Sequence, residues 1–137
     1  ALEQMIIQRC EQINDIAEQT KTRLPEILAS HRQKLSDRIA ELEVNLEPER
    51  LEQEMVLLAQ KADVAEEIDR LQNHVNEVKH TLKRDEPIGR RLDFLMQELN
   101  REANTLGSKS IDTDTTRYSV DLKVLIEQMR EQIQNIE

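Results

Sequence analysis

Acidic residues and a histidine recur at helical spacing in the middle of the chain, where they could bind a metal ion or act on a phosphodiester. On a helix at about 100° per residue, one file within about 60° contains Glu52, Asp63, Glu67, Arg70 and His74. Carboxylates and an imidazole on one face could hold a divalent cation, or serve as acid and base beside a phosphodiester. The alternative is a solvated face with ordinary helical ion pairs, such as Glu66 with Arg70.

A second polar face lies in residues 89–110, which read GRRLDFLMQELNREANTLGSKS. Opposite an apolar arc, one file contains Asp93, Gln97, Arg101 and Asn104, with Arg90 beside it. A second file contains Glu98 and Glu102, next to Arg91. Phe94 lies on this polar side, away from the apolar arc.

These side chains have two interpretations, and the residues alone leave both open. Arg suits bidentate phosphate contacts, Asn and Gln can orient a substrate, and Phe94 could stack on a base. Alternatively, this helix is covered on both sides, with Phe94 against a neighbouring subunit and the polar file satisfying itself. Ser108, Lys109 and Ser110 are compatible with phosphate, although no strand precedes them as in a P-loop.

The composition favours long helices over a compact mixed fold. The chain has 137 residues, which suggests one domain. It has 1% aromatic residues, 34% charged residues, 2 Gly and 3 Pro, which suits helices packed through aliphatic stripes. Its net charge of -9 argues against nonspecific nucleic-acid binding by the whole chain, and we expect no DNA partner. A local basic site stays compatible with this charge.

Cysteine content and hydropathy indicate a cytoplasmic protein. Cys10 is the one cysteine, so no internal disulfide can form and a reducing compartment is indicated. No apolar run approaches the roughly 18 residues that span a membrane, so no membrane partner is expected. The chain starts within a helical pattern, and we expect it to be the C-terminal part of a longer chain.

Two long helices are predicted first. Residues 1–46 carry a stripe near heptad spacing, made of Ile6, Ile13, Ile27, Leu28, Leu35 and Leu42. Pro25 predicts a kink or break in that helix. Pro48 can open a second helix over 48–83, whose stripe contains Leu51, Met55, Leu58, Ala62, Ala65, Leu71, Val75, Val78 and Leu82. Pairing the two as an antiparallel hairpin buries both stripes.

Two shorter helices follow, over residues 89–107 and 113–137. The first carries the arc Leu92, Leu95, Met96, Leu99, Ala103 and Leu106, and Gly107 is expected to end it as a C-terminal cap. Residues 112–115 offer N-cap oxygens to the second, whose stripe is Leu122, Leu125, Met129, Ile133 and Ile136. The predicted fold is therefore all-α: one domain over residues 1–137, with a long, kinked, coiled-coil-like antiparallel hairpin followed by two shorter helices.

Three stretches resemble the C-terminal domain of the bacterial YicC/YloC endoribonucleases: RLEQEMVLLAQKADVAEEIDRLQNHV (50–75), GRRLDFLMQELNREANTLGSKS (89–110) and DLKVLIEQMREQIQNIE (121–137). The resemblance covers essentially the whole chain. It implies a cytoplasmic, metal-assisted endoribonuclease that acts on RNA and forms a ring-like homo-oligomer, expected to be a hexamer. The family's N-terminal domain is absent from this sequence.

Combined with the resemblance, the polar files give a set of candidate site residues. Catalytic candidates are Glu67, His74, Glu98 and Glu102. Candidates for RNA binding are Arg70, Arg90, Arg91, Gln97, Arg101, Asn104 and Lys109. Candidate ligands for Mn²⁺ or Mg²⁺, which suit carboxylate-rich sites, are Asp63, Glu67, His74 and Glu98.

The alternative function is a structural oligomerisation module whose polar files are contacts between subunits. The location of these files distinguishes the two functions. Side chains that line a cavity favour an enzyme, whereas side chains sealed between helices favour a structural role.

Overall fold

Every described element of the chain is a helix, which confirms the all-α class. The computed structural model describes residues 2–42, 48–49, 52–53, 55–56, 64–84, 88–110 and 112–135, without the side chains of residues 31, 35, 38, 39, 41 and 42. The helices are α1 (Leu2–Leu42), α3 (Ala65–Thr81), α4 (Gly89–Ser108) and α5 (Thr113–Gln134). No strand occurs within these ranges. The start of the helix predicted over 48–83 lies mostly outside the described residues, and α3 is its later part.

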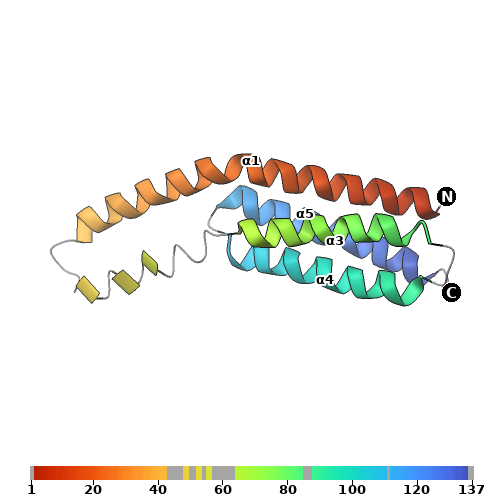
Figure 1. Cartoon of the computed structure of the whole chain (residues 1–137). Helices are drawn as coiled ribbons and strands as arrows, with labels where there is room; N and C mark the ends of the chain where they lie inside the picture. Colours follow the sequence, from red (N-terminus) through yellow and green to blue (C-terminus); the bar gives the residue numbers. More distant parts are fainter. Residues whose placement is uncertain are drawn as a thin grey trace.

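The helices form an antiparallel bundle in which neighbours in the chain are neighbours in space (Figure 1). α1 packs on α3 and α5, and α4 packs on the same two helices. α1 and α3 therefore form the two arms of the predicted hairpin. The later part of α1 extends beyond the ends of the other labelled helices (Figure 1).

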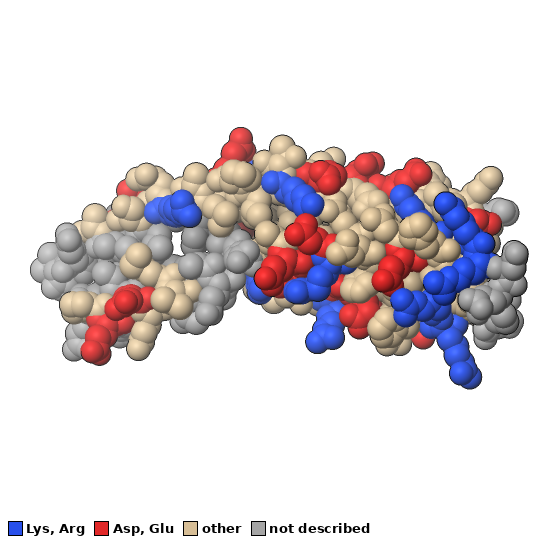
Figure 2. Space-filling view, in the orientation of Figure 1, with Lys and Arg blue, Asp and Glu red and all other residues tan. Residues whose placement is uncertain are grey.

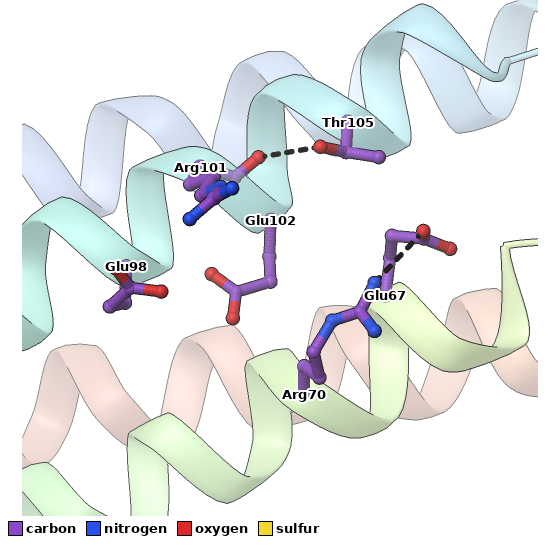
Figure 3. Close-up of a pocket in the computed structure, with 6 residues that line it drawn as sticks. All are labelled: Glu67, Arg70, Glu98, Arg101, Glu102 and Thr105. Carbon is purple, nitrogen blue, oxygen red and sulfur yellow. Dashed lines mark hydrogen bonds and ion pairs between the residues drawn. The ribbon is translucent and has the colours of Figure 1, made fainter.

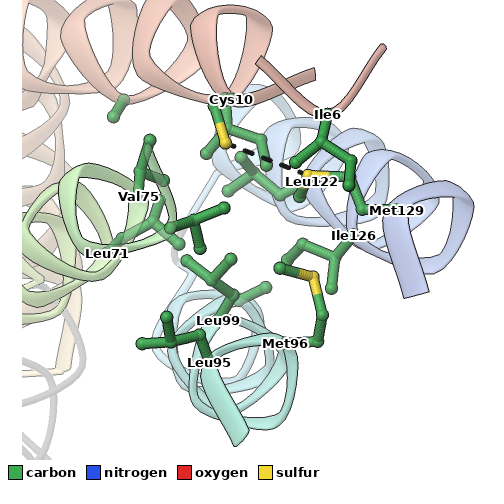
Figure 4. Packing of buried hydrophobic residues seen from close by; sticks show 14 of the residues in the cluster. Ile6, Cys10, Leu71, Val75, Leu95, Met96, Leu99, Leu122, Ile126 and Met129 are labelled. Atoms are coloured by element: carbon green, nitrogen blue, oxygen red, sulfur yellow. Dashed lines mark hydrogen bonds between the residues drawn. The ribbon is translucent and has the colours of Figure 1, made fainter. Parts of the chain in front are cut away.

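The core between the helices is almost entirely aliphatic. All six residues of the predicted α4 arc are buried, from Leu92 to Leu106. Figure 4 shows Leu95, Met96 and Leu99 pointing from α4 toward side chains of α3 and α5. Cys10 is buried among them with its Sγ 4.0 Å from Sδ of Met129, and burial raises the pKa of its thiol to about 11.

The predicted stripes of the other helices are correct in part. Ile6, Ile13 and Ile27 are buried, while Leu28 is half-buried and the side chains of Leu35 and Leu42 lie outside the described residues. Leu71, Val75 and Val78 of α3 are also buried. The prediction was wrong for Ala65 and Met55, which are exposed; Val64 and Ile68 supply the core at the start of α3. In α5, Leu125 was predicted to belong to the buried stripe but is only half-buried, and the neighbouring Ile126 is buried.

Pro25 lies inside α1 and does not break it. The helix runs without interruption from Leu2 to Leu42, and Figure 1 shows it as a bent ribbon. A proline removes one backbone hydrogen bond from a helix, and helices commonly bend at such a position and continue. The packed residues before it, from Ile6 to Thr20, and the buried Ile27 after it hold both sides against the bundle.

Gly107 does not end α4 in the predicted way. The helix continues to Ser108, and Gly107 has no positive φ. Instead, Gly107 lets α5 approach closely: a Cβ at this position would lie 2.6 Å from Oγ of Ser119. That hydroxyl donates a hydrogen bond of 2.8 Å to the carbonyl of Ala103. Glycine is therefore required here by helix packing and not by backbone conformation.

The start of α5 agrees with its predicted cap. Asp112 is the N-cap residue, and its side chain accepts a hydrogen bond of 3.2 Å from the backbone N–H of Thr115. This cap fixes the turn between α4 and α5, and so the position of Lys109 just before it.

We predict that Gly107→Ala lowers the thermal stability, although alanine is normally better than glycine inside a helix by about 0.5–1 kcal/mol. The reason is the contact with Ser119 Oγ. In a Ser119→Ala background the same change should be neutral or stabilising. A double-mutant cycle by urea unfolding measures this coupling. A stabilising effect of Gly107→Ala in the wild-type background would contradict the packing explanation.

Candidate functional site

A cavity of about 390 Å³ lies between α3 and α4, on the side opposite the aliphatic core of α4. It is lined by Glu67, Arg70, Glu98, Arg101, Glu102 and Thr105. Figure 3 shows the residues of α3 and α4 facing one another across it. Both helices are amphipathic here. Their apolar sides pack into the core of the bundle, and their polar sides face each other at the cavity.

A histidine and two carboxylates form a cluster beside this cavity. One ligand atom each from His74, Glu98 and Glu102 lies within 4.8 Å of the other two. Ligand atoms around one Mg²⁺ or Mn²⁺ lie roughly 3–4 Å apart, because each bond is about 2.1 Å long. The three side chains therefore have the types and spacing that a divalent cation requires after small adjustments.

Unpaired atoms in this cluster support its fit to a cation. Nδ1 of His74 lies 2.5 Å from Oε1 of Glu102, yet the contact lacks the direction of a hydrogen bond. Oε2 of Glu102 is also buried without a hydrogen-bond partner among the described residues. The side chain of Glu102 is only 5% exposed. Buried polar atoms without partners are rare and costly, so they indicate a group that the protein residues do not supply.

Glu67 binds two cationic side chains at the other end of the cavity. Its Oε1 accepts hydrogen bonds from Lys109, at 2.9 Å, and from Arg70, at 3.0 Å. Burial raises the pKa of Glu67, but the hydrogen bond from Lys109 and the nearby charges outweigh it, and the net pKa is lowered. Glu67 is therefore ionised at neutral pH, and its buried Oε2 has no hydrogen-bond partner within the described ranges.

The predicted metal ligands are distributed differently from expectation. His74 and Glu98 lie in the cluster, whereas Glu67 lines the same cavity outside it. Glu102, a catalytic candidate from the same file as Glu98, completes the cluster. Asp63 lies outside the described residues. The structure thus brings Glu67 and His74, from one predicted file, close to Glu98 and Glu102, from the other.

The predicted RNA-binding residues fall into three groups. Arg70 and Arg101 line the cavity, and Lys109 reaches it through Glu67. Arg91 lies outside the cavity, nearer the start of α4, where it donates a hydrogen bond of 2.8 Å to Glu77 of α3. The others are exposed on α4 without lining the cavity: Arg90, Gln97 and Asn104.

One cavity residue was not among the candidate site residues. Thr105 lines the cavity, and its hydroxyl donates a hydrogen bond of 3.0 Å to the carbonyl of Arg101. It lies four residues after Arg101, so the helical spacing would have identified it if threonine had been counted with the polar file.

The surface charge around the cavity is mixed and differs from the acidic average of the chain. Figure 2 shows basic and acidic side chains interleaved over the face that α3 and α4 form. Basic groups gather at the end of the bundle where α3 ends and α4 begins. The exposed residues of that segment include Lys83, Arg84, Arg90 and Arg91. A polyanion would meet a local positive charge here.

Comparison with known proteins identifies the family of the chain. A model of the C-terminal domain of YicC-like endoribonucleases matches residues 20–137. The chain belongs to the YicC-like endoribonuclease family. It is 54% identical over 136 residues to a probable endoribonuclease YicC of Haemophilus influenzae, covering 99% of this chain and 47% of that protein. A probable endoribonuclease YicC of Clostridioides difficile is 41% identical over 135 residues, with coverages of 96% and 46%.

The YicC-like chain thus spans about half the length of these curated relatives. The matched region includes α3, α4 and the whole cavity between them. Within the described ranges, none of its helices combines the length and apolar character of a membrane-spanning helix.

We predict that Glu102→Gln weakens Mn²⁺ binding strongly without lowering stability, because the amide keeps the size of the side chain but loses the charge. Binding of a ligand to the native state raises the free energy of unfolding, by about 2.7 kcal/mol at a hundredfold excess over Kd. Addition of Mn²⁺ should therefore raise the Tm of the wild type and leave that of the variant nearly unchanged.

The matched control is Glu77→Gln, which removes the same charge from the same groove at an exposed residue outside the cluster. It should retain the Mn²⁺ response. Equal responses of the wild type and Glu102→Gln would exclude Glu102 as a ligand.

Proposed function

We propose that this chain is the helical part of an endoribonuclease that hydrolyses RNA phosphodiester bonds with the help of a divalent cation at the α3–α4 cavity. The observation that carries this proposal is the cluster of His74, Glu98 and Glu102, with unpaired buried atoms, beside the cavity-lining Arg70 and Arg101. Membership of a family of probable endoribonucleases supports the same activity.

The cluster would hold Mn²⁺ or Mg²⁺, and the imidazole of His74 favours Mn²⁺. A cation held there would polarise a phosphoryl oxygen and lower the pKa of a water molecule. Glu98 and Glu102 supply the negative charge that attracts the cation, and His74 supplies the nitrogen ligand. All three side chains project from helices, which keeps their positions fixed relative to one another.

The cationic side chains would bind the RNA backbone. Arg101 is exposed at the cavity and makes no ion pair with any described residue, so its guanidinium is available to a phosphate. Glu67 pairs with Arg70 on the opposite wall, formed by α3, and with Lys109 at the end of α4, and so sets the positions of both cationic groups. Arg groups that face the developing charge of a phosphodiester stabilise it in the transition state.

Glu67 would have two functions. It holds the two cations in place, and its ionised carboxylate has a free oxygen, Oε2, that can accept a proton. A carboxylate with a lowered pKa is a weak base, so Glu67 is better suited to relay a proton than to remove one from an unactivated water.

The whole protein would act in the cytoplasm on RNA as a homo-oligomer, a hexamer according to the family resemblance. Val120 and Val124 of α5 are large apolar residues that are about half exposed, and contacts between copies would cover some of this surface. The same exposure favours the second candidate function, an oligomerisation module. Loss of cleavage on altering the cavity would argue for the enzyme.

We expect Glu98→Gln in the full-length protein to reduce RNA cleavage by about 100-fold or more, because loss of a ligand exceeds the roughly 10–100-fold effect of altering its supporting shell. Glu98 is only half-buried, so the fold should persist. Asp93→Asn on the same helix is the matched control: it removes one charge outside the cavity and should retain activity. Wild-type rates for Glu98→Gln would exclude this site from catalysis.

Arg101→Ala in the full-length protein should weaken RNA binding and reduce the slope of log K against log salt by about 1, because one phosphate contact is lost. Leu99→Ala should instead lower stability by roughly 2–5 kcal/mol, since its side chain is fully buried. If Arg101→Ala destabilises the fold and leaves RNA affinity and its salt slope unchanged, Arg101 has a structural role.

A further inference from the structure

Phe94 is an exposed aromatic residue in a protein that has almost none. It is the single Phe of the chain, and 46% of it is exposed. The single Tyr, Tyr118, is buried, and the largest fully buried side chains are aliphatic or Met. Full burial of such a side chain would stabilise the fold by roughly 1.5–3 kcal/mol, and part of this stabilisation is lost at Phe94. Packing of the bundle therefore does not explain why this position holds a phenylalanine.

Phe94 lies on the side of α4 that faces the cavity. The cavity-lining residues Glu98, Arg101 and Thr105 follow it at intervals of four, three and four, which is the spacing of one helix face. Figure 3 shows these three residues on the cavity side of α4. Phe94 is therefore one turn before Glu98, about 6 Å along the helix axis. Phe94 thus lies on the same face of α4 as Glu98, a residue of the proposed cation site.

Arg91 fixes one side of this ring. Its guanidinium carbon is 5.5 Å from the centroid of Phe94, within the range of a cation–π contact. The same guanidinium donates to Glu77 of α3, which holds it across the groove. The guanidinium lies over one face of the ring, and nearly half of each residue remains exposed. Such a surface accepts a planar ligand with a negative backbone nearby.

We propose that Phe94, with Arg91, stacks against one unpaired base of the RNA strand whose phosphate lies at the cavity. The proposal rests on the proposed function and defines its substrate class as single-stranded RNA, or an unpaired nucleotide in a folded RNA. A base inside a duplex is already stacked on both faces and cannot lie on the ring. Arg70 and Arg101, which line the cavity, supply the charge complementary to the adjoining backbone.

Stacking on an aromatic ring tolerates any base, because every base has a π face. Phe94 would therefore determine where the strand lies, and whether it is paired, without reading its sequence. Cleavage would follow at a fixed distance from the stacked nucleotide. Phe94 acts here as a positioning residue for the phosphodiester.

The test uses the full-length protein in EDTA, so that binding is measured without metal-dependent cleavage. Affinities are measured by fluorescence anisotropy for three kinds of RNA. These are a short single strand, a set of the same strand in which each member has one abasic site at a different position, and the matching duplex. The variants are Phe94→Ala, Phe94→Trp and, as a control, Val124→Ala, which removes apolar surface from a residue that is 51% exposed on α5.

Phe94→Ala should weaken single-strand binding by roughly 5- to 100-fold, the usual effect of losing one base–aromatic stack. An abasic site at one position should lower the RNA affinity of the wild type by a similar factor. The same abasic site should not lower the affinity of Phe94→Ala any further. Phe94→Trp and Val124→Ala should bind as the wild type does. The salt slope of Phe94→Ala should be unchanged, in contrast to that of Arg101→Ala, because no phosphate contact is lost.

Three results would overturn the proposal: unchanged affinity of Phe94→Ala, an equal loss for every abasic RNA and for the duplex, or a change in oligomer mass by sedimentation. The last would assign Phe94 to a contact between copies of the chain. Each of these results concerns Phe94 alone. If the proposed function itself were wrong, the wild type would neither bind nor cleave RNA.

Discussion

Two buried carboxylates between α3 and α4 impose the main constraint on this structure. An ionised carboxylate taken out of water costs several kcal/mol unless charges and hydrogen bonds replace the lost hydration. Glu67 has this compensation from Lys109 and Arg70. Glu102 has only the poorly aligned contact with His74, and one of its oxygens is unpartnered within the described part of the chain. The cavity therefore has a satisfied end, where two cationic side chains bind Oε1 of Glu67, and an unsatisfied end, where Glu102 lacks such partners.

The satisfied end depends on the chain immediately after α4. Lys109 is the C-cap residue of α4, and its ammonium reaches Glu67 of α3 from the end of that helix. The close packing of Gly107 on Ser119 and the cap at Asp112 hold that end in place. The backbone of the α4–α5 turn therefore helps to place the positive charge of Lys109 beside the carboxylate of Glu67.

The sequence predicted those features that depend on one helix at a time. The apolar arc of α4 and the cap at Asp112 follow from helical periodicity and local hydrogen bonding, and both are present. A long first helix with a kink near Pro25 was predicted and is present, but the exposed Ala65 was not predicted, because tertiary packing decides which face of a helix is covered. Gly107 was misinterpreted because a capping glycine and a packing glycine look the same in a single sequence.

The composition of the site was predicted less completely than the fold for a related reason. Each polar file could be found on its own helix, but the offset between two helices is fixed by core side chains far from the files. A shift of one turn would have brought a different carboxylate opposite His74. The clustering of Glu102 with His74, and of Glu67 with Lys109, is therefore information that only the packed structure contains.

The order of the helices also has a consequence for how the chain folds. Each pair of packed helices consists of chain neighbours, except α1 and α5, which close the bundle. The contact between Cys10 and Met129 in that seam joins residues 119 positions apart. Contacts between chain neighbours form quickly, whereas distant ones require the closure of a long loop. We therefore expect α3, α4 and α5 to assemble first, so that the walls of the cavity are in place before α1 docks and completes the hydrophobic core.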